Sequence, residues 1–243
     1  MSLPLTIGLV TGANQGIGLE VARKLSAENT NYHIIMAGRR KDAIGKAAEE
    51  LQLEGHSVEP LVLDLASDKS IEEAVAYVSN EYGFLDVLIN NAGIGGDSPM
   101  GPWARKEWQK VFDTNVFGTF AVTDSFLPLL ANSTKTKRIV FVSSELGSLA
   151  RKTEPSKAFV LPYKVYAASK TALNMMAVNL AAEYSQDPTW KINMACPGHC
   201  ATFTDFQAPQ SAAAGAVSVC RLATLGPGGK TGTFSNSEGT IPW

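Results

Sequence analysis

The chain has 243 residues, 45% of them hydrophobic and 18% charged, with a net charge of −2 and three cysteines. One large α/β domain fits this length, and a near-neutral charge without blocks of one sign argues against binding to a nucleic-acid backbone. No apolar run approaches a membrane span, the first predicted strand begins too early for a signal peptide, and the cysteines form neither a disulfide framework nor a zinc-ligand pattern. We therefore expect a cytoplasmic protein with no metal site and no membrane or nucleic-acid partner.

The first two predicted elements enclose a glycine-rich turn. Leu5–Thr11 is an apolar run without alternation, typical of a strand buried on both faces, and a helical pattern covers Leu19–Glu28. The intervening turn is spaced G-x-x-x-G-x-G, which differs from the commoner dinucleotide fingerprint G-x-G-x-x-G. A strand, a glycine turn and a helix together form a phosphate cradle, whereas the alternative is a glycine turn without a ligand. The candidate cofactor-binding residues here are Gly12, Asn14, Gln15, Gly16, Ile17 and Gly18.

A second buried strand is predicted at Tyr32–Ala37, followed by Gly38, Arg39 and Arg40. In NAD-binding folds an acidic residue at this position bonds the ribose 2′-hydroxyl, whereas a basic residue suits a 2′-phosphate. The planar guanidinium of Arg39 matches a phosphate in particular. We therefore predict NADP(H) as cofactor, with Arg39 and Arg40 in its site; the alternative is that both arginines are solvated residues before the next helix.

Further strand-helix pairs follow in regular alternation. Helices are predicted at Asp42–Glu54 and Lys69–Tyr82, and strands at Val58–Leu63 and Leu85–Ile89. This alternation predicts a parallel sheet with helices on both faces, in which ligands lie outside the carboxyl ends of the strands. At the carboxyl ends of the third and fourth strands the chain continues with Asp64 and with Asn90-Asn91, respectively. Asp64 could hydrogen-bond to an adenine amino group. The candidate cofactor-binding residues at these two ends are Asp64, Leu65, Asn91 and Gly93.

The second half of the chain continues the same pattern and contains no linker or internal repeat. We expect a helix over Lys106–Leu130 containing the polar Asn115, a strand Arg138–Val142 ending at Ser143-Ser144, irregular chain over 145–164, a helix Tyr166–Gln186, a strand Lys191–Ala195 ending at Pro197-Gly198-His199, a helix at about Ser211–Leu225 and a short strand near Thr233. The prediction is one domain over residues 1–243, an α/β fold with a Rossmann-type doubly wound parallel sheet of about seven strands.

Tyr166 and Lys170 are four residues apart, so on a helix their side chains share one face. An ammonium beside a phenol favours the phenolate and would lower the tyrosine pKa below its usual value of about 10. Tyr166 could then donate and accept a proton near neutral pH. The spacing Y-x-x-x-K by itself is also compatible with a solvated surface pair.

The order and spacing of the motifs resemble the short-chain dehydrogenase/reductase superfamily, and within it the NADPH-dependent carbonyl reductases, including the ending Gly-Thr-Ile-Pro-Trp. The motifs are Thr11-Gly12-x-x-x-Gly16-x-Gly18, Asp64, Asn90-Asn91-Ala92-Gly93, Asn115, Ser144, Tyr166-x-x-x-Lys170 and Pro197-Gly198-x-x-x-Thr202. The match covers essentially the whole chain.

The resemblance implies a role for each catalytic residue. Tyr166 is expected to protonate the carbonyl oxygen, and Lys170 to lower the pKa of Tyr166 and bond the nicotinamide ribose. Ser144, or Ser143 as the second choice, would hold the same oxygen, and Asn115 would position a water in a proton relay past Lys170. Pro197, Gly198 and Thr202 would complete the cofactor site, with Thr202 at the carboxamide.

Two departures from the family pattern concern the substrate side. Ser144 and Tyr166 are 22 residues apart, which is longer than usual, and the surplus at Leu149–Tyr163 is expected to form a loop there. Relatives with an insertion here can lose the helix contact that builds tetramers, so we expect a monomer or a dimer. The segment Thr202–Pro209 makes only a small lid, which implies an open pocket. Its candidate lining residues, equally well explained as packing, are Phe203, Phe206, His199 and Tyr163.

The leading functional hypothesis is NADPH-dependent reduction of a ketone or aldehyde, with a small carbonyl compound as the partner. Biosynthetic alternatives are an enone or imine reductase and a non-redox cyclase that uses the same cofactor site. A nucleotide sensor or scaffold is a different class, but such proteins usually lose the tyrosine or the lysine, and both are present.

Overall fold

The computed structural model describes residues 4–95, 104–154, 163–200 and 208–243. It contains a seven-stranded sheet in the order β3-β2-β1-β4-β5-β6-β7, in which every neighbouring pair is parallel. The strands are β1 (Thr6–Thr11), β2 (Tyr32–Gly38), β3 (Val58–Val62), β4 (Val87–Asn90), β5 (Lys137–Val142), β6 (Trp190–Ala195) and β7 (Phe234–Ser235). The predicted doubly wound α/β fold is confirmed.

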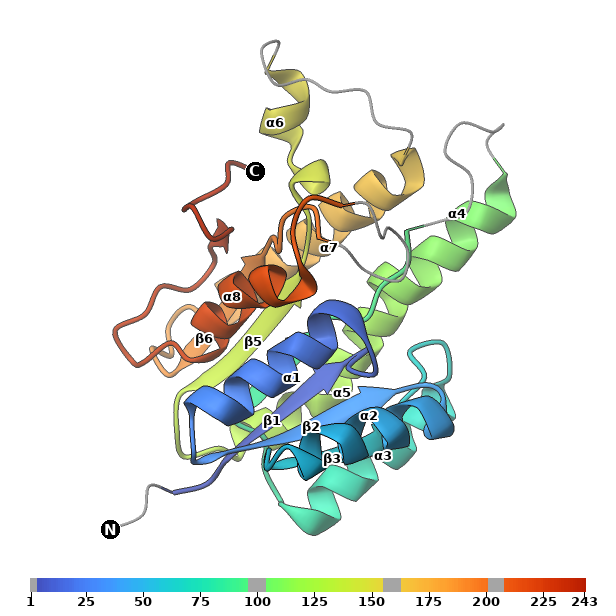
Figure 1. Cartoon of the computed structure of the whole chain (residues 1–243). Coiled ribbons are helices and arrows are strands. Elements are labelled where there is room, and N and C mark those ends of the chain that lie inside the picture. The colour runs from blue at the N-terminus through green and yellow to red at the C-terminus, as the bar shows by residue number, and fades with distance from the viewer. Residues whose placement is uncertain (1–3, 96–103, 155–162, 201–207) are drawn as a thin grey trace.

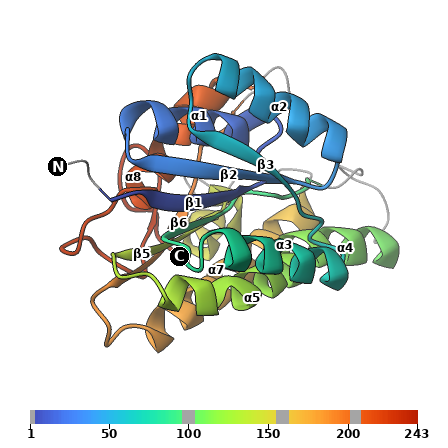
Figure 2. The same ribbon diagram turned by 90° about the horizontal axis from the view of Figure 1, so that it is seen from below.

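Helices cover both faces of the sheet (Figures 1 and 2). One face carries α1 (Gly16–Glu28), α2 (Lys41–Leu53) and α8 (Ala212–Ala223). The other carries α3 (Asp68–Glu81), α4 (Arg105–Phe112), α5 (Thr119–Ala131) and α7 (Lys164–Glu183). Among the helices in the described part of the chain, none is both long and apolar enough to cross a membrane.

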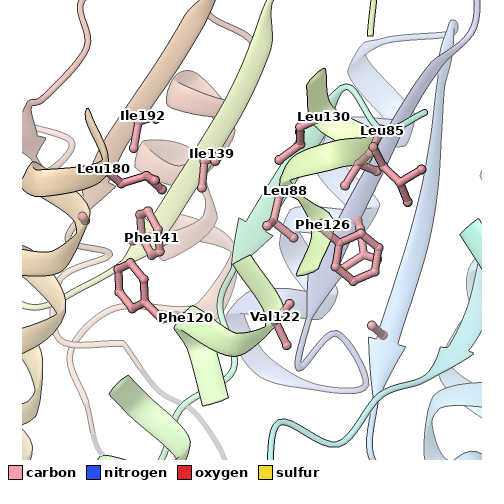
Figure 3. Packing of buried hydrophobic residues seen from close by; sticks show 14 of the residues in the cluster. Leu85, Leu88, Phe120, Val122, Phe126, Leu130, Ile139, Phe141, Leu180 and Ile192 are labelled. Atoms are coloured by element: carbon pink, nitrogen blue, oxygen red, sulfur yellow. The ribbon is translucent and has the colours of Figure 1, made fainter. Parts of the chain in front are cut away.

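The core consists of two apolar layers, one on each face of the sheet. In β1, Ile7 and Leu9 belong to the layer under α3, α5 and α7, and Val10 belongs to the layer under α1, α2 and α8. Burial on both faces explains why this strand shows no polar alternation. In the first layer, Phe120 stacks on Phe141 with ring centroids 5.3 Å apart (Figure 3).

The long helix predicted at Lys106–Leu130 is interrupted, so that prediction is corrected. A π-helical turn, η1 (Asp113–Gly118), separates α4 from α5. Gly118 permits a close approach at this turn, because a β carbon there would lie 2.2 Å from the carbonyl oxygen of Leu65. Such turns are frequent at functional sites, and this one contains Asn115.

The segment after Ser144 is also more ordered than predicted. It forms a short 3₁₀ helix, η2 (Glu145–Gly147), and then α6 (Leu149–Thr153), whose first turn is capped by the hydroxyl of Ser148. The expected lid at Thr202–Pro209 lies largely outside the described residues, as do Thr202, Phe203 and Phe206. The helix predicted from Leu19 begins at Gly16, directly within the glycine turn.

Candidate active site

The glycine turn between β1 and α1 forms a cradle at the carboxyl edge of the sheet. Gly12 has φ of +66°, which favours glycine, and a β carbon on Gly18 would lie only 2.5 Å from the carbonyl oxygen of Gly12. The first turn of α1 contains no acidic residue, and Gln15 does not cap it with its side chain. The backbone N–H groups of this turn therefore suit an anion, and the cradle fits the pyrophosphate of a dinucleotide.

Asn91 supports this turn from the neighbouring strand. Its side-chain amide donates to the carbonyl oxygens of Thr11 at 2.8 Å and Gly12 at 3.3 Å. The hydroxyl of Thr11 in turn accepts the backbone N–H groups of Asn91 and Ala92, both at 3.0 Å. Asn91 thus ties the end of β4 to the end of β1, a structural role that its place in the sequence motif does not reveal.

Arg39 and Arg40 are exposed immediately after β2, on the same edge of the sheet. None of the salt bridges between described residues involves either arginine, and both side chains are exposed, so they are accessible to an anionic ligand. Asp64 follows β3, and one of its carboxylate oxygens accepts the N–H of Ala66 at 3.1 Å. Leu65 is buried, so its side chain belongs to the packing at this edge.

The two serines at the end of β5 face different partners. Ser143 is 2% exposed, and its hydroxyl donates to Oδ1 of Asn174 at 2.6 Å. Ser144 is partly exposed, accepts the N–H of Leu146 at 3.2 Å and hydrogen-bonds to Tyr166. The geometry therefore favours Ser144 over Ser143 as the serine of the site.

Asn174 received no role from the sequence reasoning. It lies four residues after Lys170 on α7, so Tyr166, Lys170 and Asn174 continue one helical face at i, i+4 and i+8. Extending this spacing by one step would have identified Asn174 as a neighbour of the site.

The side chain of Lys170 is buried at the carboxyl end of β5, where the residue is only 4% exposed. Its Nζ donates to the carbonyl oxygen of Val142 at 2.7 Å and lies 5.6 Å from the centre of the Tyr166 ring. Burial lowers the pKa of Lys170 to about 8, because desolvation disfavours the charged form.

The expectation that the pKa of Tyr166 falls below its usual value is wrong in this structure. Burial, reinforced by the neighbouring Cys196, raises the pKa of Tyr166 to about 12, and the hydrogen bond with Ser144 opposes this only in part. The i, i+4 spacing places the ammonium beside the ring but carries no information about desolvation. Tyr166 is consequently protonated at neutral pH and can act as a hydrogen-bond and proton donor.

Asn115 is fully buried, and its amide bonds residues that are distant in the sequence. Its Oδ1 accepts the N–H of Ile94 at 2.8 Å, while its Nδ2 donates to the carbonyl oxygen of Ile94 at 2.9 Å and to the hydroxyl of Ser169 at 3.0 Å. A β carbon on Gly93 would lie 3.3 Å from Oδ1 of Asn115 and 3.6 Å from Nζ of Lys170. Gly93 therefore borders both predicted members of the relay.

The remaining predicted residues follow β6. Gly198 has φ of +81°, and a β carbon there would lie 2.2 Å from Oε1 of Gln210, so the turn requires glycine. Pro197 is partly buried and His199 exposed. Tyr163, directly before α7, is 42% exposed. The predicted Thr202 cannot be placed because it lies outside the described residues.

The parallel sheet, the glycine turn and the tyrosine, lysine and serine at this edge are typical of nucleotide-binding α/β oxidoreductases. A family model described as short chain dehydrogenase matches residues 6–213. Short-chain dehydrogenase anuI of Penicillium roqueforti is 36% identical over 240 residues, covering 96% of this chain and 94% of that protein. The chain belongs to the short-chain dehydrogenase/reductase family and is an NAD(P)-dependent oxidoreductase acting on alcohol or carbonyl groups.

Two further relatives are similar over most of the chain. A putative ketoacyl reductase of Streptomyces coelicolor is 33% identical over 193 residues, covering 79% of this chain and 69% of that protein. The structure of an actinorhodin polyketide ketoreductase with NADPH superposes with a TM-score of 0.81 at 26% identity, covering 96% of this chain and 95% of that chain.

Proposed function

We propose that this enzyme reduces a ketone or an aldehyde to an alcohol with NADPH. The observation that carries the proposal is the meeting of Ser144, Tyr166 and Lys170 at the carboxyl ends of β5 and β6, beside the glycine cradle. Two neighbouring hydroxyl groups, with the buried Lys170 ammonium 5.6 Å from the centre of the tyrosine ring, suit an oxygen atom on which negative charge develops.

Each of the three side chains has a separate part in the proton chemistry. Tyr166 donates its phenolic proton to the carbonyl oxygen, and Ser144 hydrogen-bonds to the same oxygen and orients it. The Lys170 ammonium, 5.6 Å from the centre of the Tyr166 ring, stabilises the phenolate that remains. When bound, the nicotinamide cofactor supplies the hydride that reaches the carbonyl carbon. Asn115 fixes Ile94 and Ser169 beside Lys170, and we assign it the positioning of the water that returns a proton.

NADPH is proposed over NADH because of the two exposed arginines after β2. Arg39 and Arg40 present guanidinium groups where a 2′-phosphate would lie, and no carboxylate occurs between the start of β2 and Asp42. The glycine cradle would hold the pyrophosphate, and Asp64 the adenine. The NADPH in the related ketoreductase structure supports the same choice.

A ketone is the proposed substrate group because similar proteins include a ketoacyl reductase and a polyketide ketoreductase. We further propose that residues 1–243 form one domain that acts as a monomer or a dimer. Light scattering coupled to size-exclusion chromatography measures the second point directly.

The test follows NADPH absorbance with a panel of aldehydes, quinones and bulky ketones, with NADH in parallel. We expect turnover that prefers NADPH, and a loss of at least about 100-fold in kcat for Tyr166→Phe with NADPH binding retained. Replacing both Arg39 and Arg40 by alanine should lower the preference for NADPH over NADH by about 10-fold or more. Full activity of Tyr166→Phe would refute the catalytic assignment, and equal use of NADH by the wild type would refute the arginine assignment.

A further inference from the structure

The 3₁₀ helix η2 directly follows Ser144, and the Ser144 side chain caps its first turn. Ser144 accepts the N–H of Leu146, which lies within η2, and hydrogen-bonds to Tyr166 with the same hydroxyl group. A shift of η2 therefore moves the Ser144 hydroxyl relative to Tyr166. What holds η2 in place consequently bears on the reaction.

One side of η2 rests on α7. A β carbon on Gly147 would lie 2.8 Å from the backbone carbon of Lys170, so glycine permits direct contact between the two backbones. The hydroxyl of Thr171 donates to the carbonyl oxygen of Gly147 at 3.0 Å. This contact fixes the end of η2 that is farther from Ser144.

The other side of η2 is held by the segment that follows β7. Nδ2 of Asn236 donates to Oε1 of Glu145 at 2.9 Å, next to Ser144 in the sequence. Farther along, the hydroxyl of Ser148 donates to the carbonyl oxygen of Pro242 at 2.6 Å, and the N–H of Ala150 donates to that of Trp243 at 2.7 Å. Figure 1 shows this last segment, in dark red, rising beside α6.

Asn236 is itself fixed in position. Its Oδ1 accepts the N–H groups of Glu238 and Gly239, and its carbonyl oxygen accepts a bond from Arg221 of α8. The Trp243 ring stacks on Phe234 of β7 with centroids 5.6 Å apart, so the segment is anchored to the sheet at both ends. The side-chain amide of Asn236, fixed by these bonds, thus donates to Glu145, the residue directly after Ser144.

We propose that Asn236 is a positioning residue for the reaction: its bond to Glu145 fixes η2 and thereby directs the Ser144 hydroxyl toward Tyr166. Asn236 touches neither the carbonyl oxygen nor the cofactor in this scheme and acts only through Ser144. The inference rests on the proposed function, since it assumes that Ser144 orients the reacting oxygen. Neither Asn236 nor Glu145 belongs to the sequence motifs that resemble the short-chain dehydrogenase/reductase family.

The principal variant is Asn236→Asp, which keeps the acceptor for Glu238 and Gly239 but replaces the donor by a carboxylate facing Glu145. We expect kcat to fall by about 10-fold with little change in KM for NADPH, because misplacement of an orienting group slows the chemical step. The matched control is Ser237→Asp, which adds the same charge at the next, exposed position and should retain wild-type kcat.

Reversal of the bond provides the rescue. In the double variant Asn236→Asp with Glu145→Gln, the glutamine amide can donate to the new carboxylate, and we expect kcat to return to within about 2-fold of wild type. Glu145→Gln alone keeps an acceptor for Asn236 and should be nearly as active as wild type. Glu145→Ala removes the acceptor, so it replaces Asn236→Asp in the comparison if that variant folds poorly in a thermal melt.

The decisive comparison is made in a Ser144→Ala background. If Asn236 acts through Ser144, Asn236→Asp should cause no further loss of kcat there. An equal loss in both backgrounds, or failure of the reversed pair to rescue, overturns the positioning role. If Ser144→Ala is fully active, Ser144 has no part in the proposed function, and the role of Asn236 is refuted as well. If Ser144→Ala is inactive but Asn236→Asp is fully active, only the role of Asn236 is refuted.

Discussion

Replacing Lys170 by methionine should make the protein more stable near neutral pH while removing its activity. The ammonium of Lys170 is 4% exposed, and burial lowers its pKa from 10.5 to about 8. A difference of about 2.5 pKa units corresponds to about 3 kcal/mol of unfolding free energy that the buried charge costs below pH 8. Methionine has a similar length and no charge, although it cannot donate to the carbonyl oxygen of Val142.

The pH dependence separates this charge effect from the lost hydrogen bond. Between pH 8 and 10.5 the folded lysine has released its proton while the unfolded lysine retains it, so the contribution of Lys170 to the stability of the wild type rises with pH. Lys170→Met lacks this titration. Its stability advantage over the wild type should therefore shrink by about 2 kcal/mol between about pH 7 and about pH 9.5.

Urea unfolding followed by tryptophan fluorescence at the two pH values measures this difference. Lys46→Met, which replaces an exposed lysine of α2, is the control for a general effect of removing a positive charge. If the stability difference between Lys170→Met and the wild type is the same at both pH values, the buried charge is not the source of the destabilisation.

Three further predictions concern sites around the sheet. Burial raises the pKa of Glu59, but hydrogen bonds from Tyr77 and Tyr82, together with the nearby His33, outweigh burial and hold that pKa below 4.5. The wild type should therefore lose stability relative to Glu59→Gln as the pH falls below about 4.5, measured by acid unfolding. Gly18→Ala would place a β carbon 2.5 Å from Nδ2 of Asn91, and we expect weaker NADPH binding in a fluorescence titration; unchanged affinity would show that the turn adapts. Asp86 is fully buried and accepts hydrogen bonds from the backbone N–H of Ile7 and from the hydroxyl of Ser133. Asp86→Ala should therefore lower the free energy of unfolding by about 3 kcal/mol, measured by urea unfolding. A decrease below about 1 kcal/mol would show that these bonds contribute little to stability.

The features that sequence reasoning predicted correctly are those set by local pattern. Apolar runs such as β1, the glycine turn and the i, i+4 relation of Tyr166 and Lys170 each depend on a few consecutive residues. The parallel sheet with helices on both faces follows from the regular alternation of strands and helices and from the right-handed connection of parallel strands. These rules sufficed to place the candidate residues on one edge of the sheet.

The features that were missed depend on contacts between distant residues. The π-helical turn accompanies bonds from Asn115 to Ile94 and to Ser169, which lies 54 residues away. The place of Asn91 at the cofactor stays a prediction, but the hydrogen bond from its side-chain amide to the carbonyl oxygen of Thr11, 80 residues away in the chain, was not predicted. Helix propensity and residue spacing describe only neighbours in the sequence, so they cannot predict hydrogen bonds to distant residues. A polar residue inside a predicted helix is therefore better interpreted as a sign of such a distant contact.

The raised pKa of Tyr166 has a consequence for the direction of the reaction. A phenol with pKa of about 12 remains protonated at neutral pH, which favours its use as the acid in reduction. The kcat for reduction should then be flat between about pH 6 and pH 8 and fall above that range, as Lys170 loses the proton that stabilises the phenolate. If kcat for reduction already begins to fall below about pH 7 as the pH is raised, Tyr166 loses its proton far below pH 12 during turnover. Desolvation would then be outweighed in the working complex, and the i, i+4 ammonium would dominate the behaviour of the phenol.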